Sequence, residues 1–331
     1  MAAKKKTKKK AASKPKKLES FAVFGASRFA VRSLEVLAEA GFQPSQIYTQ
    51  KVMDTETWKR TKMSPVSRWA KKNDQSATVA DGSNQDKWLP GLLESPPDLV
   101  LTLGLDTPLP EELWTAPRLG CIGIHASNLP KYRGANPLRA IIGAGDNTTG
   151  VTAYRIEGPD WDGPILHNEQ MDIGPEDVYG DLVPRVAELF GEVTLKVVQK
   201  LAKGSKFQEK KQDDKRKSHS TRVDRRHRRA PWWLTAKEVY DRLRAYSPEP
   251  GLETFIGAKR VEVLSGQPMD WMKPTFGDTG TFLGIRSGKI AVLCDQSTVF
   301  GIDRLRLLGG EAQGAADYAR EIELSVGSGL V

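Results

Sequence analysis

The first apolar stretch of the chain, FAVF at residues 21–24, ends at Gly25, and the segment after it is apolar at helical spacing as far as Gly41. This pattern predicts a strand, a turn and an amphipathic helix that ends at Gly41. The turn, GASRFA, contains one glycine where a dinucleotide-binding fingerprint has three. The sequence therefore does not indicate nicotinamide or flavin binding.

Short β-rich runs and helical periodicity continue to alternate along the first two thirds of the chain. Further β-rich runs lie at residues 47–50, 98–103 and 119–124, and helical periodicity returns from Pro65 and over residues 181–202. The unbroken apolar character of DLVLTL at 98–103 is typical of a central parallel strand. Strands that alternate with helices predict a doubly wound α/β domain.

The pattern changes after residue 203. Residues 203–229 are hydrophilic, basic and without periodicity, which indicates a linker. A helix capped by Thr235 follows, and then five β-rich runs that predict a small barrel or open sheet, at 253–256, 260–264, 279–285, 289–293 and 299–307. We therefore expect a disordered lysine-rich tail at 1–19, the α/β domain at 20–204, a basic linker at 205–230 and a β-rich domain at 231–331.

The net charge of +9 is concentrated in two segments of the 331 residues. Residues 1–17 hold nine lysines and no acidic residue, and residues 206–229 hold eleven Lys and Arg against four Asp and Glu, a local charge of 11 − 4 = +7. The rest of the chain is then close to 9 − 9 − 7 = −7. Positive charge confined to two segments suits a polyanionic partner more than a small metabolite, although such segments can also be merely solvated.

Composition limits the compartment and the chemistry. No apolar run approaches the ~20 residues of a membrane helix, and the N-terminal lysines precede no apolar signal core, so we expect a soluble, cytoplasmic protein without a membrane contact. Cys121 and Cys294 lie in separate apolar runs and are expected to be buried thiols. The four histidines and two distant cysteines give no ligand spacing, so no metal is expected.

His125 is the candidate catalytic residue. It stands where the apolar run 119–124 gives way to a loop of Asn, Pro, Tyr, Arg and Gly. In an open parallel sheet, ligands bind at the carboxyl ends of the strands, so a histidine at a strand exit is well placed for chemistry.

From Gly120 onward the sequence GCIGIHASNLPKYRGANP, followed by TTGVT, resembles the 10-formyltetrahydrofolate-dependent formyltransferases, and among them those that act on methionyl-tRNA. The resemblance runs from Ser20 to the end of the chain. It implies a Rossmann-like formyltransferase domain, a small OB-like β-barrel domain, 10-formyltetrahydrofolate as co-substrate, charged initiator tRNA as partner and, we expect, a monomer.

The resemblance also implies roles for individual residues. His125 is expected to be catalytic, and the residues expected to contact the folate are Ser127, Asn128, Leu129 and Pro130. The residues expected to contact tRNA are Lys59, Arg60 and Lys62 in a loop, and Arg225, Arg226, Arg228 and Arg229 in the linker.

Three positions depart from the family pattern. Gly123 stands where the family has Asn, Trp161 falls where it has the catalytic Asp, and Asn128 replaces a Leu. Asp160 or Asp162 can supply the carboxylate if the strand carries a bulge, because a shift of one residue turns side chains to the opposite face. Asn128 is a second source of an amide donor.

Three hypotheses follow from these residues. The chain transfers formyl groups to methionyl-tRNA, or it is a catalytically weakened paralogue that binds tRNA or folate, or it acts on an amino sugar nucleotide. The basic linker and the second domain favour the first, and Gly123 with Trp161 favour the second.

Overall fold

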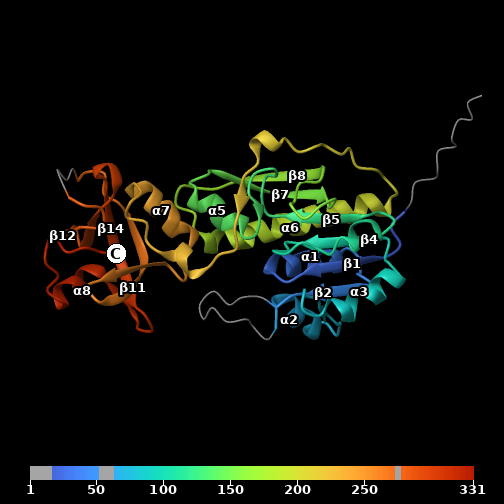
Figure 1. Cartoon of the computed structure of the whole chain (residues 1–331), viewed down its shortest axis with the longest axis horizontal. Helices are drawn as coiled ribbons and strands as arrows, with labels where there is room; N and C mark the ends of the chain where they lie inside the picture. The colour runs from blue at the N-terminus through green and yellow to red at the C-terminus, as the bar shows by residue number, and fades with distance from the viewer. Residues whose placement is uncertain (1–16, 52–62, 273–276) are drawn as a thin grey trace, which may run out of the picture.

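The computed structural model describes residues 17–51, 63–272 and 277–331. An α/β domain and an all-antiparallel β domain lie end to end, with α5 of the first against α7 of the second (Figure 1). The fold class expected from the sequence is confirmed, since a sheet with helices on its faces is followed by an antiparallel sheet.

The N-terminal sheet has seven strands in the order β3-β2-β1-β4-β5-β7-β8. Their bounds are β1 Phe21–Gly25, β2 Gln46–Thr49, β3 Thr78–Val79, β4 Leu99–Leu103, β5 Cys121–His125, β7 Thr148–Arg155 and β8 Ile165–Asp172. The first five strands are parallel and the last two antiparallel. β7 and β8 are antiparallel to each other because the connection between them, residues 156–164, is too short for a helical crossover.

Helices cover both faces of this sheet, because successive side chains of β1 and β4 are buried on opposite sides. The bounds are α1 Arg28–Glu39, α2 Pro65–Lys72, α3 Gln85–Glu94, α4 Glu112–Thr115, α5 Pro137–Gly143 and α6 Tyr179–Ala202. A buried hydrogen bond of 3.0 Å joins Ser33 of α1 to Thr194 of α6 where the two helices pack together.

The C-terminal domain begins with α7 (Ala236–Ala245), capped as expected by Thr235, whose hydroxyl accepts from the Glu238 N–H. Its antiparallel sheet has the order β10-β11-β14-β13-β12, with β15 beside β14. The bounds are β10 Leu252–Ile256, β11 Lys259–Pro268, β12 Phe282–Arg286, β13 Lys289–Leu293, β14 Val299–Leu307 and β15 Ala312–Gly314, followed by α8 Ala315–Glu321. The five predicted β-rich runs thus match strands β10 to β14.

The basic segment between the domains lies along the N-terminal domain before it enters the second (Figure 1). Lys210 and Ile165 exchange two backbone hydrogen bonds of 2.8 and 2.9 Å. β9 (His219–Ser220) then pairs with β6 (Arg133–Gly134), in the loop after His125. The short 3-10 helices η1 (Asp214–Arg216) and η2 (Arg225–Arg228) belong to the same segment, and η3 (Asp295–Ser297) lies in the second domain. The segment therefore reaches the candidate site.

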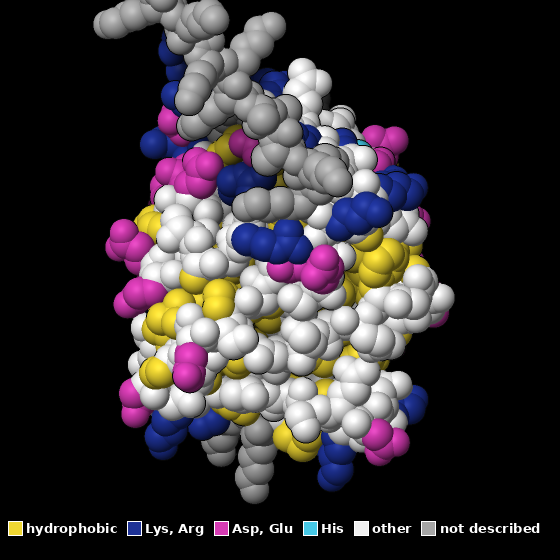
Figure 2. Space-filling model, turned by 90° about the vertical axis from the view of Figure 1, so that its right-hand side faces the viewer, with side chains coloured by type: hydrophobic (Ala, Val, Ile, Leu, Met, Phe, Trp, Pro, Cys, Tyr) yellow, Lys and Arg dark blue, Asp and Glu magenta, His cyan; other side chains and the backbone are white. Residues whose placement is uncertain are grey.

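Both cysteines are buried and unpaired, as expected. Within the described ranges, no helix is long and apolar enough to cross a membrane. At the end of the N-terminal domain remote from the second domain, basic and acidic side chains of the described residues are interspersed (Figure 2).

Candidate active site

His125 ends β5 and is buried, with 3% of its surface exposed. Its Nε2 lies 2.9 Å from the carbonyl oxygen of Tyr132, which the loop brings back with a left-handed φ of 57° at that residue. Because a carbonyl oxygen can only accept, Nε2 carries the hydrogen, and in the neutral ring Nδ1 is the proton acceptor. Burial lowers the pKa of His125 to about 4.

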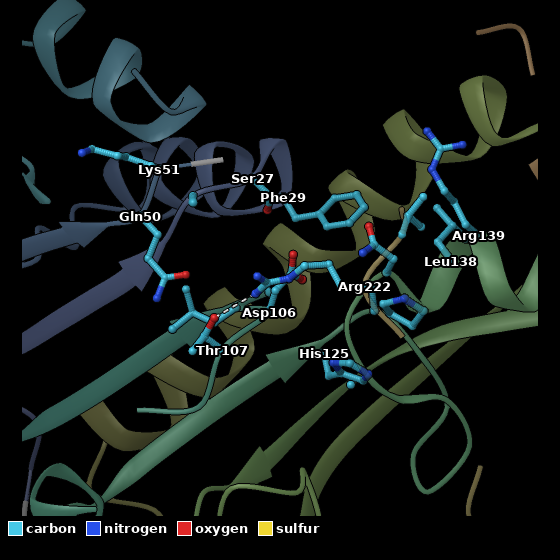
Figure 3. A pocket seen from close by; sticks show the side chains of 18 of the residues that line it. Ser27, Phe29, Gln50, Lys51, Asp106, Thr107, His125, Leu138, Arg139 and Arg222 are labelled. Atoms are coloured by element: carbon cyan, nitrogen blue, oxygen red, sulfur yellow. Dashed lines mark hydrogen bonds between the residues drawn. The ribbon is translucent and has the colours of Figure 1, made fainter. Parts of the chain in front are cut away.

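His125 lines a cavity of about 390 Å³ at the carboxyl ends of β1, β4 and β5. This volume is in the range of pockets that hold small organic ligands. Figure 3 shows apolar side chains such as Phe29 and Leu138 on one side and the polar Asp106 and Thr107 on another. The strand exit therefore carries the pocket that the sequence predicts.

Gly123 faces Tyr154 across the β5–β7 pair. A Cβ at residue 123 would lie 2.3 to 2.6 Å from the phenol ring and hydroxyl of Tyr154, closer than real side chains approach. Tyr154 is buried. Its burial raises the pKa of its hydroxyl, and the negative charge of the Asp162 carboxylate raises it further. The space used by an asparagine side chain in the family pattern is thus filled by a phenol.

Trp161 is held beside the histidine, with the two ring centroids 6.3 Å apart. Its backbone is left-handed, with a φ of 55°. Gln212 of the basic segment fixes this turn, because its Nε2 donates to the carbonyls of Trp161 at 2.8 Å and Gly163 at 2.7 Å. The buried Arg133 donates in turn to Gln212 Oε1, at 2.8 Å from Nη2.

Neither acidic candidate hydrogen-bonds to His125. Asp160 and Asp162 are exposed, and the Asp160 carboxylate lies 3.5 Å from Nε2 of His219. Between Tyr154 and Trp161 there is a cavity of about 20 Å³, room for a water and no more. In the part of the chain that the structure describes, His125 makes one hydrogen bond, to Tyr132, and none to a carboxylate.

The expected folate contacts are engaged within the protein. Ser127 Oγ donates to the Lys131 carbonyl at 2.7 Å, Leu129 N donates to Thr152 Oγ1 at 3.2 Å, and Pro130 follows a cis bond. Asn128 Oδ1 accepts from Asn168 Nδ2 at 3.1 Å, which turns its side chain toward β8. None of the four lines the large cavity.

The expected tRNA contacts separate into three groups. Lys59, Arg60 and Lys62 lie outside the described residues. Arg225, Arg226 and Arg229 are exposed. Arg228 is instead 2% exposed and lies 2.5 Å from Glu262 and 3.0 Å from Glu253, so it supports the second domain and is not available to a polyanion.

Three residues of the site were not singled out from the sequence: Asp106, Tyr154 and Arg222. Asp106 lies three residues after the end of β4, in GLDTP, and its place near a strand exit was an available signal. No sequence signal places Arg222 in this pocket, because it comes from a segment without periodicity and reaches the cavity through tertiary packing alone.

The open α/β sheet and the pocket beside His125 define an α/β enzyme that acts at the carboxyl ends of its strands. Residues 20–198 match the formyl transferase family and residues 222–323 match the formyl transferase C-terminal domain. The chain therefore belongs to the formyl transferase family, which uses 10-formyltetrahydrofolate as its formyl donor, as expected from the sequence.

A methionyl-tRNA formyltransferase of Pseudomonas fluorescens is 29% identical over 92% of this chain and 95% of its own length. Another, of Methylococcus capsulatus, is 31% identical over 74% of this chain and 80% of its own length.

Two solved structures share the fold. The N-formyltransferase of Helicobacter canadensis, in complex with folinic acid and dTDP-3-aminofucose, has a TM-score of 0.62 at 17% identity and covers 86% of this chain and 98% of its own. HypX of Aquifex aeolicus, in complex with tetrahydrofolic acid, has a TM-score of 0.56 at 17% identity and covers 92% of this chain and 48% of its own.

The large cavity fits a folate in chemistry. Apolar side chains such as Phe29 suit a flat heteroaromatic ring, and Gln50 and Thr107 offer hydrogen bonds to its edge. The basic side chains of Lys51 and Arg222 suit an anionic glutamate tail. When bound, the folate supplies the activated formyl carbon.

Proposed function

We propose that this chain transfers the formyl group of 10-formyltetrahydrofolate to the amino group of methionyl-tRNA in the cytoplasm, at the start of translation. The observation that carries the proposal is the match along both domains to relatives named for that activity, over 92% of the chain. The exposed arginines Arg225, Arg226 and Arg229 support a tRNA substrate, because phosphate contacts supply most of the affinity for nucleic acid.

The chemistry of the site supports transfer at a low rate. Formyl transfer needs a neutral amine, a proton acceptor and a hydrogen-bond donor for the oxyanion. The neutral ring of His125 offers a proton acceptor at Nδ1, while its Nε2–H is occupied by the Tyr132 carbonyl. Gly123 supplies no side-chain donor, and loss of one oxyanion donor typically costs ~10²–10³ in rate.

His125 is also a weak base for this step. Its pKa of about 4 lies well below that of an α-amino group, ~8, so complete proton transfer between them is unfavourable by about 5 kcal/mol. A group better matched to the amine would be needed for efficient transfer.

A second candidate is favoured by the filled position at Gly123. Tyr154 and Trp161 occupy the places of the amide and carboxylate that the family pattern sets around its histidine. A paralogue that binds tRNA or folate without efficient transfer is consistent with this packing.

Incubation with 10-formyltetrahydrofolate and charged initiator tRNA separates the candidates. We expect formyl-methionyl-tRNA to form slowly, and to form faster than any formylated product from dTDP-3-aminofucose or from uncharged tRNA. Tight binding of the charged tRNA without product would support the second candidate, and preferential formylation of the sugar would contradict the first.

A further inference from the structure

The large cavity contains a carboxylate at a position that the family pattern does not assign. Asp106 follows β4 in the loop Gly104–Thr107, and both it and His125 line the cavity of about 390 Å³ (Figure 3). Its side chain is reached by water, whereas Asp160 and Asp162 lie outside the cavity's wall. Asp106 and His125 therefore share one space into which a ligand can enter.

Asp106 is held in place from two sides. The backbone N–H of Asn136, just before α5, and the guanidinium of Arg222 both favour the charged form of its carboxylate. Arg222 Nη2 donates to Thr107 Oγ1 at 3.0 Å, the contact drawn in Figure 3. The basic segment thus closes over the loop that carries Asp106.

Other charged and titratable groups also face the cavity. Lys51 follows β2, Arg139 projects from α5 and Tyr179 from α6, and Asp81 lies after β3. The Asp81 carboxylate accepts from the backbone N–H of Ser83 at 2.9 Å, within its own turn. Arg139 stacks on the Tyr179 ring with its guanidinium carbon 3.6 Å from the ring centroid, on the side toward α7.

We propose that Asp106 binds the ammonium group of the acceptor and takes its proton, in place of the carboxylate that Trp161 has displaced from the side of His125. The inference rests on the proposed function, because it assigns a residue to the amine acceptor of that reaction. An ammonium group presents donors that a carboxylate accepts, and among the described residues the other carboxylate that lines the cavity is Asp81, which is half-buried and accepts within its own turn.

The proton balance of the step is complete. The acceptor ammonium loses two protons when its nitrogen forms the new bond to the formyl carbon. The first passes to Asp106 and leaves a neutral amine that can attack. As the bond between the formyl carbon and the folate nitrogen breaks, one proton ends on that nitrogen and the other goes to solvent.

The protein atoms around Asp106 remove part of its hydration, although its carboxylate is still reached by water, and this raises its pKa; the charge of Arg222 and the Asn136 N–H oppose the increase. A carboxylate with a raised pKa is a better proton acceptor for an amine than an ordinary exposed carboxylate is. This places the two groups in complementary roles, with Asp106 near the nitrogen and His125 as a neighbouring hydrogen-bond acceptor.

Amine binding tests the proposal without requiring catalysis. L-Methionine methyl ester carries the ammonium and no carboxylate, and its desamino analogue lacks only the nitrogen. We expect calorimetric titration to show that Asp106→Asn binds the ester at least ten times more weakly than the wild-type chain. Asp106→Glu is expected to retain binding, and Asp81→Asn is the matched control. The desamino analogue should bind all four proteins equally.

Three outcomes would overturn the assignment: equal binding of the ester by Asp106→Asn, loss of binding with Asp81→Asn instead, or equal loss of both ligands in a folded Asp106→Asn variant. Melting temperatures establish that each variant is folded. If the ester binds in an Asp106-dependent way but no formyl-methionyl-tRNA forms, the amine site stands and only the proposed function fails. The experiment therefore distinguishes failure of the Asp106 amine site from failure of the proposed formyl transfer.

Discussion

Tyr154 fills the space in which any side chain at Gly123 would have to stand, because the phenol lies within 2.6 Å of the Cβ position at that residue. The two residues pair directly across β5 and β7. The absence of the family's asparagine at residue 123 and the burial of Tyr154 are therefore coupled. Introducing an asparagine at residue 123 requires a smaller side chain at residue 154.

This pairing predicts a non-additive effect on stability. Gly123→Asn alone overpacks the strand pair and is expected to lower the free energy of unfolding by about 1–3 kcal/mol or more. Tyr154→Val relieves the clash, so the double variant should be more stable than the sum of the single effects implies. Urea unfolding of the four proteins measures the coupling, and additive values would contradict the contact.

His125 predicts a pH dependence of stability. Its folded pKa, about 4, is below the unfolded value of about 6.5, so the unfolded chain binds the proton first as the pH falls. The neutral ring's contribution to the free energy of unfolding is fully present above pH ~6.5 and is lost progressively as the pH falls toward ~4.

Between pH 7.5 and pH 5 this one group is expected to cost about 2 kcal/mol of unfolding free energy. His125→Gln should remove that part of the pH dependence, as measured by urea unfolding at the two pH values. An unchanged dependence in the variant would show that the ring titrates normally.

Arg228 and Arg229 are adjacent in sequence, but we expect their alanine variants to differ, one in stability and the other in tRNA binding. Arg228→Ala removes one of the two arginine partners of the buried Glu262, the other being Arg306, and leaves the Gly251 carbonyl without the Arg228 donor, so it is expected to destabilise the second domain by about 1–3 kcal/mol. Arg229→Ala removes an exposed charge, so we expect unchanged stability, weaker tRNA binding and a smaller salt dependence, by about one ion. Thermal melts and filter binding over a salt series distinguish the two, and a shared phenotype would contradict the assignment.

The hydrogen bonds from Gln212 indicate that the basic segment stabilises the turn at Trp161. Gln212→Ala leaves the carbonyls of Trp161 and Gly163 without their donor and should cost about 1–3 kcal/mol for each group that stays buried. We also expect trypsin to cleave residues 203–230 faster. Gln170→Ala, at an exposed position on β8, is the matched control. Equal cleavage in both variants would show that the segment is held elsewhere.

Local pattern was enough to predict most of the fold. The apolar run at 98–103 is strand β4, Pro65 begins α2, and Thr235 caps α7, because each of these depends on neighbours in sequence. The antiparallel direction of β7 and β8 was not visible in this way, since a strand's direction depends on its connections.

The candidate site was predicted only in part, for the same reason. His125 sits at a strand exit and within a recognisable motif, and the structure places it in a pocket. Asp106 and Arg222 line the same pocket from the loop after β4 and the basic segment, and Tyr154 of β7 lies against Gly123; only tertiary packing brings these segments together. Arg228 was expected at the surface because its burial depends on Glu262, 34 residues away.

The most direct test of the account is a single-turnover measurement of formyl-methionyl-tRNA formation by the wild-type chain and by His125→Ala, at saturating 10-formyltetrahydrofolate. We predict measurable product from the wild type and a loss of at least ~10² in rate with the alanine variant, as expected when a group beside the reacting atoms is removed. Equal rates in the two proteins, or no product from a wild-type chain that binds both substrates, would contradict the assignment of transfer to this pocket.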